Sequence, residues 1–210
     1  MPDSRTTGSD ASSGQGYGKL PELINLAFVA LLGWWTINLQ PAESPALMLR
    51  PADLQPCESD QYGYLRGEVF GAVRKTLDWR GRSMLCDGML RPDNRGLRLV
   101  FSESAEAPDA GLRLVIGIAG AVPGGDDAEL IANVTLIDQD QGLFFSTQGM
   151  ERCWARLIEQ VQTPDQTGIW RISGQLYCVG ALAAVDGPKS ITLGEIDFSG
   201  RLTLEPDETR

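Results

Sequence analysis

The chain has 210 residues, with 28 acidic residues, 18 basic residues, no histidine and a net charge of −10. Without histidine, every Ser-His-Asp and Cys-His catalytic arrangement is excluded and the commonest metal ligand is missing. The sequence contains no Lys/Arg run, which argues against a nucleic-acid partner. It also contains no glycine-rich phosphate-binding or dinucleotide-binding motif, so we expect no cofactor.

The first part of the chain combines a polar tail with an apolar segment. Residues 1–22 are rich in serine, glycine, aspartate and threonine, a composition typical of flexible tails. The segment Leu23 to Leu39 (LINLAFVALLGWWTINL) carries no formal charge. As a helix it would be about 25 Å long, the short end of a bilayer span, and Trp34 and Trp35 would lie near the headgroups. We therefore expect a transmembrane anchor over residues 23–39.

Two alternatives to a retained anchor are a cleaved signal peptide and a buried core helix. The tail before the apolar segment is long and weakly basic for a signal peptide, which favours retention. Two cations, Arg5 and Lys19, precede the segment and only Arg50 follows closely, a slight bias toward an internal N-terminus. The domain after the anchor is then extracytoplasmic, or periplasmic.

The segment after the anchor reads as a linker over residues 40–60. Four prolines divide it: Pro41, Pro45, Pro51 and Pro56. We expect no regular element before about Asp60. From residue 61 to residue 205, short apolar alternations are separated by glycine, proline and aspartate clusters, and residues 206–210 form a short tail. This pattern predicts an all-β domain, an antiparallel β-sandwich of jelly-roll-like or Ig-like type with about ten strands.

Most of the expected strands follow from alternation. They cover residues 64–77 (one strand or two), 83–90, 97–101, 112–118, 130–137, 143–147, 191–198 and 201–204. A hairpin is expected between the strands at 130–137 and 143–147, because the polar stretch Asp138–Gly142 lies between them.

The segment Cys153–Gln162 fits either an amphipathic helix or a strand. As a strand it would pair with Ile169–Tyr177, symmetrically about the turn at residues 163–168. That register pairs Cys153 with Cys178, Ala155 with Leu176, Leu157 with Gly174, Ile158 with Ser173, Gln160 with Arg171 and Val161 with Trp170. Because one register both separates an apolar from a polar face and aligns two cysteines, we favour the hairpin.

The four cysteines, which lack metal-site spacing, are expected to form two disulfide bonds. The hairpin register pairs Cys153 with Cys178, and Cys57 and Cys86 are then paired by elimination. Other pairings stay open, since four cysteines allow three connectivities. The alternative is a set of four reduced, buried thiols in a cytoplasmic protein.

Trp154 and Tyr177 are the candidate binding residues. In the expected hairpin they lie opposite each other on an otherwise polar face. An exposed Trp–Tyr pair would offer an amphipathic surface to a sugar ring or a partner protein. The alternative is a cross-strand pair covered by a neighbouring loop.

Three carboxylate groupings are examples of candidate sites, and no catalytic or metal-binding residue is assigned from them. Glu195 and Asp197 would lie about 7 Å apart on one strand face, a separation that inverting glycosidases use, but charges commonly alternate on solvated strands. Calcium is conceivable at two acidic loops, although neither has the ligand density of a known calcium motif. These loops contain Asp138 and Asp140, and Asp126, Asp127 and Glu129.

The expected function is that of a non-enzymatic, membrane-anchored cell-envelope protein. Its β-sandwich would bind, or assemble structurally with, another envelope component, either a protein or a glycan. The alternative is a carboxylate-dependent glycan hydrolase or a carbohydrate-binding module.

Overall fold

The computed structural model describes residues 54–57, 63–105, 111–125, 129–164 and 166–204. The chain divides into two units, residues 1–47 and residues 48–210, and every described residue lies in the second. The expected tail, the anchor over Leu23–Leu39 and most of the linker therefore lie outside the described residues. Within the described ranges, no helix has the length and apolar character needed to cross a bilayer.

The described residues form thirteen strands in one antiparallel sheet, so the prediction of an all-β domain is confirmed. The strands are β1 (Gln55–Pro56), β2 (Tyr64–Gly71), β3 (Lys75–Arg80), β4 (Met84–Leu90), β5 (Gly96–Glu103), β6 (Leu112–Ala119), β7 (Glu129–Asp138), β8 (Leu143–Ser146), β9 (Cys153–Gln162), β10 (Ile169–Cys178), β11 (Leu182–Ala184), β12 (Ser190–Leu193) and β13 (Ile196–Thr203). A single 3₁₀ turn, η2 (Gly81–Ser83), separates β3 from β4.

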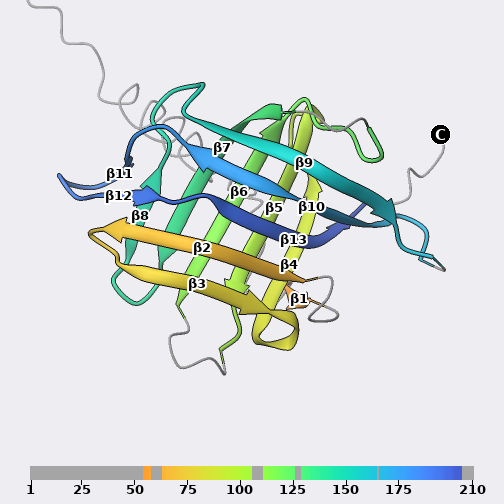
Figure 1. The fold of residues 1–210 in the computed structure, drawn as a ribbon, viewed down its shortest axis with the longest axis horizontal. Helices are drawn as coiled ribbons and strands as arrows, with labels where there is room; N and C mark the ends of the chain where they lie inside the picture. Colours follow the sequence, from red (N-terminus) through yellow and green to blue (C-terminus); the bar gives the residue numbers. More distant parts are fainter. Residues whose placement is uncertain (1–53, 58–62, 106–110, 126–128, 165, 205–210) are drawn as a thin grey trace, which may run out of the picture. The chain divides into compact units, whose positions relative to one another are not determined.

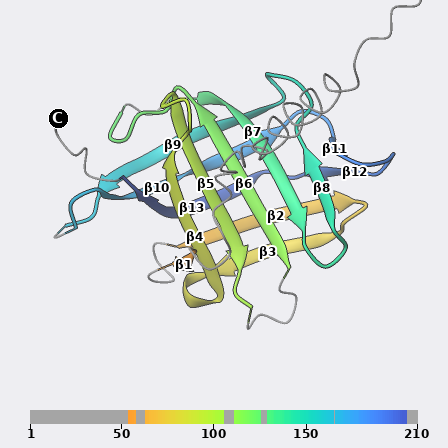
Figure 2. The same cartoon turned by 180° about the vertical axis from the view of Figure 1, so that it is seen from behind.

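The strands are arranged in two layers that cross steeply (Figures 1 and 2). One layer contains β3, β2, β13, β10 and β9, and the other contains β4 to β8 in chain order, with β1 at the β4 edge. Strand β7 belongs to both layers, because its first half pairs with β9 and its second half with β8. Short strands β11 and β12 lie between β8 of one layer and β2 of the other in the sheet order. The two layers are therefore connected twice, through β11 and β12 and through the pairing of β7 with β9.

The core lies between the two layers and follows from strand alternation. In β6, the side chains of Leu112, Leu114, Ile116 and Ile118 are buried, and the residues between them are half-buried. Burying a side chain of this size stabilises the fold by about 1.5–3 kcal/mol. The expected hairpin of β7 and β8 is present, with Asp138 paired to Leu143.

The layers pack closely where β13 crosses β5. Phe198 of β13 packs against Phe101 of β5, with ring centroids 6.0 Å apart. Two residues further on, a Cβ at Gly200 would lie 2.7 Å from Cε1 of Phe101. Only glycine allows this approach without moving a fully buried ring.

Three expectations about strand limits need correction. Strand β1 lies in the segment expected to contain no regular element, where Pro56 is tolerated because β1 is an edge strand. The strand expected over residues 191–198 is two strands, since the register along β2 changes by one residue between Leu193 and Asp197. The strand expected over residues 201–204 is not separate, because β13 runs without a break to Thr203. Residues 64–77, expected to hold one strand or two, hold β2 and the start of β3. With the added short strands β1 and β11, the total is thirteen rather than about ten.

Candidate functional site

The hairpin of β9 and β10 carries both candidate binding residues. The observed register pairs Cys153 with Cys178, Trp154 with Tyr177 and Ala155 with Leu176. It continues through Arg156 with Gln175 and Leu157 with Gly174. The strand interpretation of Cys153–Gln162 is therefore confirmed, as are the pairings expected as far as Leu157.

Beyond Leu157 the expected register is wrong by one residue. A β-bulge at Ile158 leaves that residue without a partner, so Ser173 pairs with Glu159 and Ile172 pairs with Gln160. As a result Ile158 and Glu159 both point outward. Val161 was expected on the apolar face opposite Trp170, but it pairs with Arg171 and is exposed. The cause is the extra residue in β9, because every residue after the bulge then faces the side opposite to the one expected.

All four cysteines are in disulfide bonds. Cys153 is bonded to Cys178, with Cα atoms 4.0 Å apart, and Cys57 is bonded to Cys86, with Cα atoms 5.5 Å apart. These are the two pairs expected from the sequence. The first bond closes the hairpin beside Trp154 and Tyr177, and the second ties the segment after β1 to β4.

The rings of Trp154 and Tyr177 stack on each other, with centroids 5.6 Å apart and an angle of 19° between the planes. Trp154 is half-buried, and Tyr177 has 36% of its surface exposed. Since the rings stack face to face, they do not form a platform of two coplanar rings. A ligand would instead meet the ring of Tyr177, with Trp154 supporting it from behind.

The pair has a strand neighbour on the β7 side, whereas the pairing with β13 stops before it. Ile131 of β7 pairs with Trp154. The pairing of β10 with β13 ends at Leu176, one residue before Tyr177. No β13 residue therefore lies in register opposite Tyr177, which is 36% exposed.

The Tyr177 hydroxyl is in a polar environment that favours its neutral form. Partial desolvation raises the pKa of the phenol, and a hydrogen bond to the Glu129 carboxylate raises this pKa further. The phenol thus acts as a hydrogen-bond donor at neutral pH, anchored to the first residue of β7. Sequence reasoning missed this partner, because nothing local indicated that β7 pairs with β9.

The candidate carboxylates from the sequence have other contacts in the described residues. Asp197 is exposed and accepts a hydrogen bond from Gln175 at 3.0 Å, and Glu195 lies in the break before β13. Asp138 accepts two hydrogen bonds from Gln141, an arrangement that fixes the β7–β8 turn. No group of three or more acidic or cysteine side chains that could hold a metal ion is present in the described part of the chain. Asp126 and Asp127 lie outside it.

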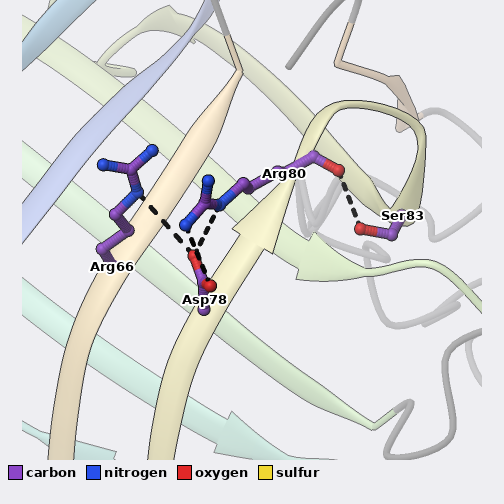
Figure 3. A network of polar contacts seen from close by, with 4 residues as sticks. All are labelled: Arg66, Asp78, Arg80 and Ser83. Atoms are coloured by element: carbon purple, nitrogen blue, oxygen red, sulfur yellow. Dashed lines mark hydrogen bonds and ion pairs between the residues drawn. The ribbon is translucent and has the colours of Figure 1, made fainter. Parts of the chain in front are cut away.

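The outer face around β2 and β3 is polar and crossed by ion pairs (Figure 3). Asp78 accepts two hydrogen bonds from Arg80, at 2.7 and 3.0 Å, and its Oδ1 lies 3.7 Å from Arg66. The hydroxyl of Ser83 donates to the Arg80 carbonyl. This surface therefore differs in character from the aromatic surface of the β9–β10 hairpin.

Comparisons with family models, with curated proteins and with solved structures gave no significant match for this chain. The proposals below therefore rest on the residues and on their geometry.

Proposed function

We propose that this chain is a non-enzymatic cell-envelope protein, held in a membrane by the segment Leu23–Leu39. Its β-domain is extracytoplasmic, or periplasmic, and binds or assembles with another envelope component, a protein or a glycan. The aromatic pair Trp154 and Tyr177 forms the contact surface. The finer assignment of the domain to a jelly-roll-like or Ig-like sandwich is part of the same proposal.

The binding role is supported chiefly by the exposed ring of Tyr177. Aromatic residues with a polar tip carry a large share of the binding energy at interfaces, because they bury a large apolar area and still form a hydrogen bond. Tyr177 has both features, since its side chain is 36% exposed and its hydroxyl is held by Glu129. The stacked Trp154 and the adjacent disulfide keep the ring in place before binding, which lowers the entropic cost of association.

The compartment is supported by the two disulfide bonds. Disulfides persist in oxidising compartments and are rare in the cytosol. Both bonds lie in the domain that follows the apolar segment, as expected for a domain carried across a membrane by an N-terminal anchor.

A glycan remains a possible component, because the face of an aromatic ring suits the apolar face of a sugar. A glycan-binding module would use the same Tyr177 surface. A glycan hydrolase would need two carboxylates that flank a bound sugar, whereas Asp197 accepts a hydrogen bond from Gln175.

The proposal is tested by solubilising the full chain in detergent and identifying what co-purifies with it. We expect the double substitution Trp154→Ser and Tyr177→Ser to remove the co-purifying component. Val185→Ser is the matched control, because Val185 is also an exposed apolar residue but lies next to β8. Retention of the component by the double variant, or its loss from the Val185 control, would contradict the proposal.

A thermal melt of the same variants separates binding from folding. If the aromatic surface acts in binding, the double variant keeps its melting temperature within a few degrees. A large drop in melting temperature together with unchanged co-purification would show that the pair serves only stability.

A further inference from the structure

A cleft of about 190 Å³ lies at the far end of the β9–β10 hairpin from Trp154 and Tyr177. Its apolar walls include Trp170, Pro164 and Ile169, and the Cys57–Cys86 disulfide lies at its inner end. The side chains of Arg171 and Arg201 also line it, and no acidic residue is among its described lining residues. A cleft of this volume has room for a group of about one aromatic ring, since cavities of about 150 Å³ bind benzene.

The two arginines are direct neighbours. Arg171 of β10 pairs with Arg201 of β13 in the strand register, which brings their Cβ atoms to about 4.5–5.5 Å. Like charges directly opposite each other in a sheet are destabilising, and a buried charge needs strong compensating contacts. The Arg201 side chain is only 15% exposed, so this requirement applies to it in particular.

The contacts of Arg201 meet this requirement incompletely. Its Nη1 donates to the amide oxygen of Gln55 at 3.2 Å, and its Nε lies 3.8 Å from Asp87 Oδ1. That oxygen already accepts hydrogen bonds from the Gly88 amide and the Thr203 hydroxyl. Among the described residues, Arg201 Nε is buried and has no hydrogen-bond acceptor.

Arg171 has a closer partner at the other side of the cleft. Its Nη2 donates to Glu159 Oε1 at 2.7 Å, and this glutamate is on the outward-facing stretch that follows the bulge. The two arginines therefore have different acidic neighbours, Glu159 and Asp87, and neither of these carboxylates is among the described residues that line the cleft.

We propose that this cleft binds a carboxylate that is attached to an apolar group of about one ring. The carboxylate accepts hydrogen bonds from the Arg171 and Arg201 guanidinium groups, and planar guanidinium groups suit this contact because they offer paired donors. The apolar group packs against Trp170. The bound anion offsets the repulsion between the two arginines.

This site is separate from the Tyr177 surface and does not depend on the function proposed for it. A carboxylate attached to an apolar group occurs both in a free aromatic acid and in a polypeptide that ends in an apolar residue. Benzoate represents the free acid and N-acetylphenylalanine represents the chain terminus. Benzamide is the neutral control, because it has nearly the same shape as benzoate but no charge.

The test is calorimetric titration of the detergent-solubilised full chain with each of the three probes. We expect benzoate or N-acetylphenylalanine to bind at least about tenfold more tightly than benzamide. Tighter binding of N-acetylphenylalanine indicates a chain terminus as the source, and tighter binding of benzoate indicates a free acid. Equal binding of benzoate and benzamide, or binding of sulfate as tight as that of benzoate, would overturn the proposal.

Variants locate the site. Arg201→Gln should weaken carboxylate binding by about tenfold or more, whereas Arg156→Gln, on the same hairpin but outside the cleft, should leave it unchanged. Val161→Trp is the second variant, because Val161 is exposed, lies beside Arg171 and can fill the cleft without removing a charge. Unchanged binding by Val161→Trp, or a loss with Arg156→Gln equal to that with Arg201→Gln, would place the ligand elsewhere and overturn the assignment.

Discussion

Lys75 Nζ lies 3.0 Å from Glu103 Oε2 and joins the edge strand β3 of one layer to the end of β5 in the other. The two side chains are only 19% and 9% exposed. The ion pair of Asp78 with Arg80 is as short, at 2.7 Å, but about half of each side chain is in solvent (Figure 3). Since water screens charges, the two ion pairs should differ in their contribution to stability although their distances are alike.

We expect Lys75→Met to lower the free energy of unfolding by about 3–5 kcal/mol, because it leaves the Glu103 carboxylate buried without its cation. Asp78→Asn, the control at an exposed pair, should cost about 1 kcal/mol or less. The double variant Lys75→Met, Glu103→Leu should recover most of the loss. Urea unfolding of the four proteins checks this, and equal losses for Lys75→Met and Asp78→Asn would contradict it.

The raised pKa of Tyr177 makes the aromatic site sensitive to alkaline pH. The folded-state pKa lies above the ordinary value of 10.0, so the stability that the neutral phenol contributes is fully present below about pH 10 and is lost as the pH rises through the folded-state pKa. The absorbance difference between the wild type and Tyr177→Phe isolates this tyrosine from the others. We expect Glu129→Gln to lower the pKa toward 10.0, and an unchanged pKa in this variant would exclude the Glu129 contact.

The disulfide pairing predicts the outcome of peptide mapping without reduction, which should recover Cys57 linked to Cys86 and Cys153 linked to Cys178. The two bonds span 29 and 25 residues. Replacing either pair with alanine should lower the free energy of unfolding by a similar amount, about 3 kcal/mol in the chain-entropy model. Four alkylatable thiols in the native protein, or a peptide joining Cys86 to Cys178, would refute the pairing.

The bulge in β9 makes one deletion unusually tolerable. Removing Ile158 leaves the pairing on both sides of it intact, because Leu157 and Glu159 already pair with consecutive residues of β10. We expect a cost of about 1 kcal/mol or less. Deleting Ala155 instead shifts the strand by one residue and reverses which side chains face the core, so that variant should not fold. Thermal melts of the two deletions test the difference, and similar losses would show that the bulge itself is needed.

The proposed anchor predicts the location of the full chain. It should fractionate with membranes, and a reporter fused after residue 210 should be active only outside the cytoplasm, because residues 23–39 carry no charge and have the length of a short bilayer span. A fusion active only in the cytoplasm would refute this orientation.

Much of the fold follows from local patterns in the sequence, and the remainder depends on pairings between distant segments. Alternation located strands such as β6, and symmetry about one turn gave the β9–β10 register as far as Leu157. The bulge was not predictable, because an apolar residue such as Ile158 fits a core-facing position as well as an outward one. The arginine cleft was missed because it assembles distant residues, with Gln55 bonded to Arg201 across 146 positions.

The central place of β13 has a consequence for the biosynthesis of the protein. Strand β13 pairs with β10 on one side and with β2 on the other, yet it is the last strand along the described chain. Neither neighbour can complete its hydrogen bonding until Thr203 has left the ribosome and any translocation channel. A chain that stops before Ile196 would expose two unpaired edges inside one layer, which are ready templates for aggregation. Quality control of this protein therefore depends on its last strand being made.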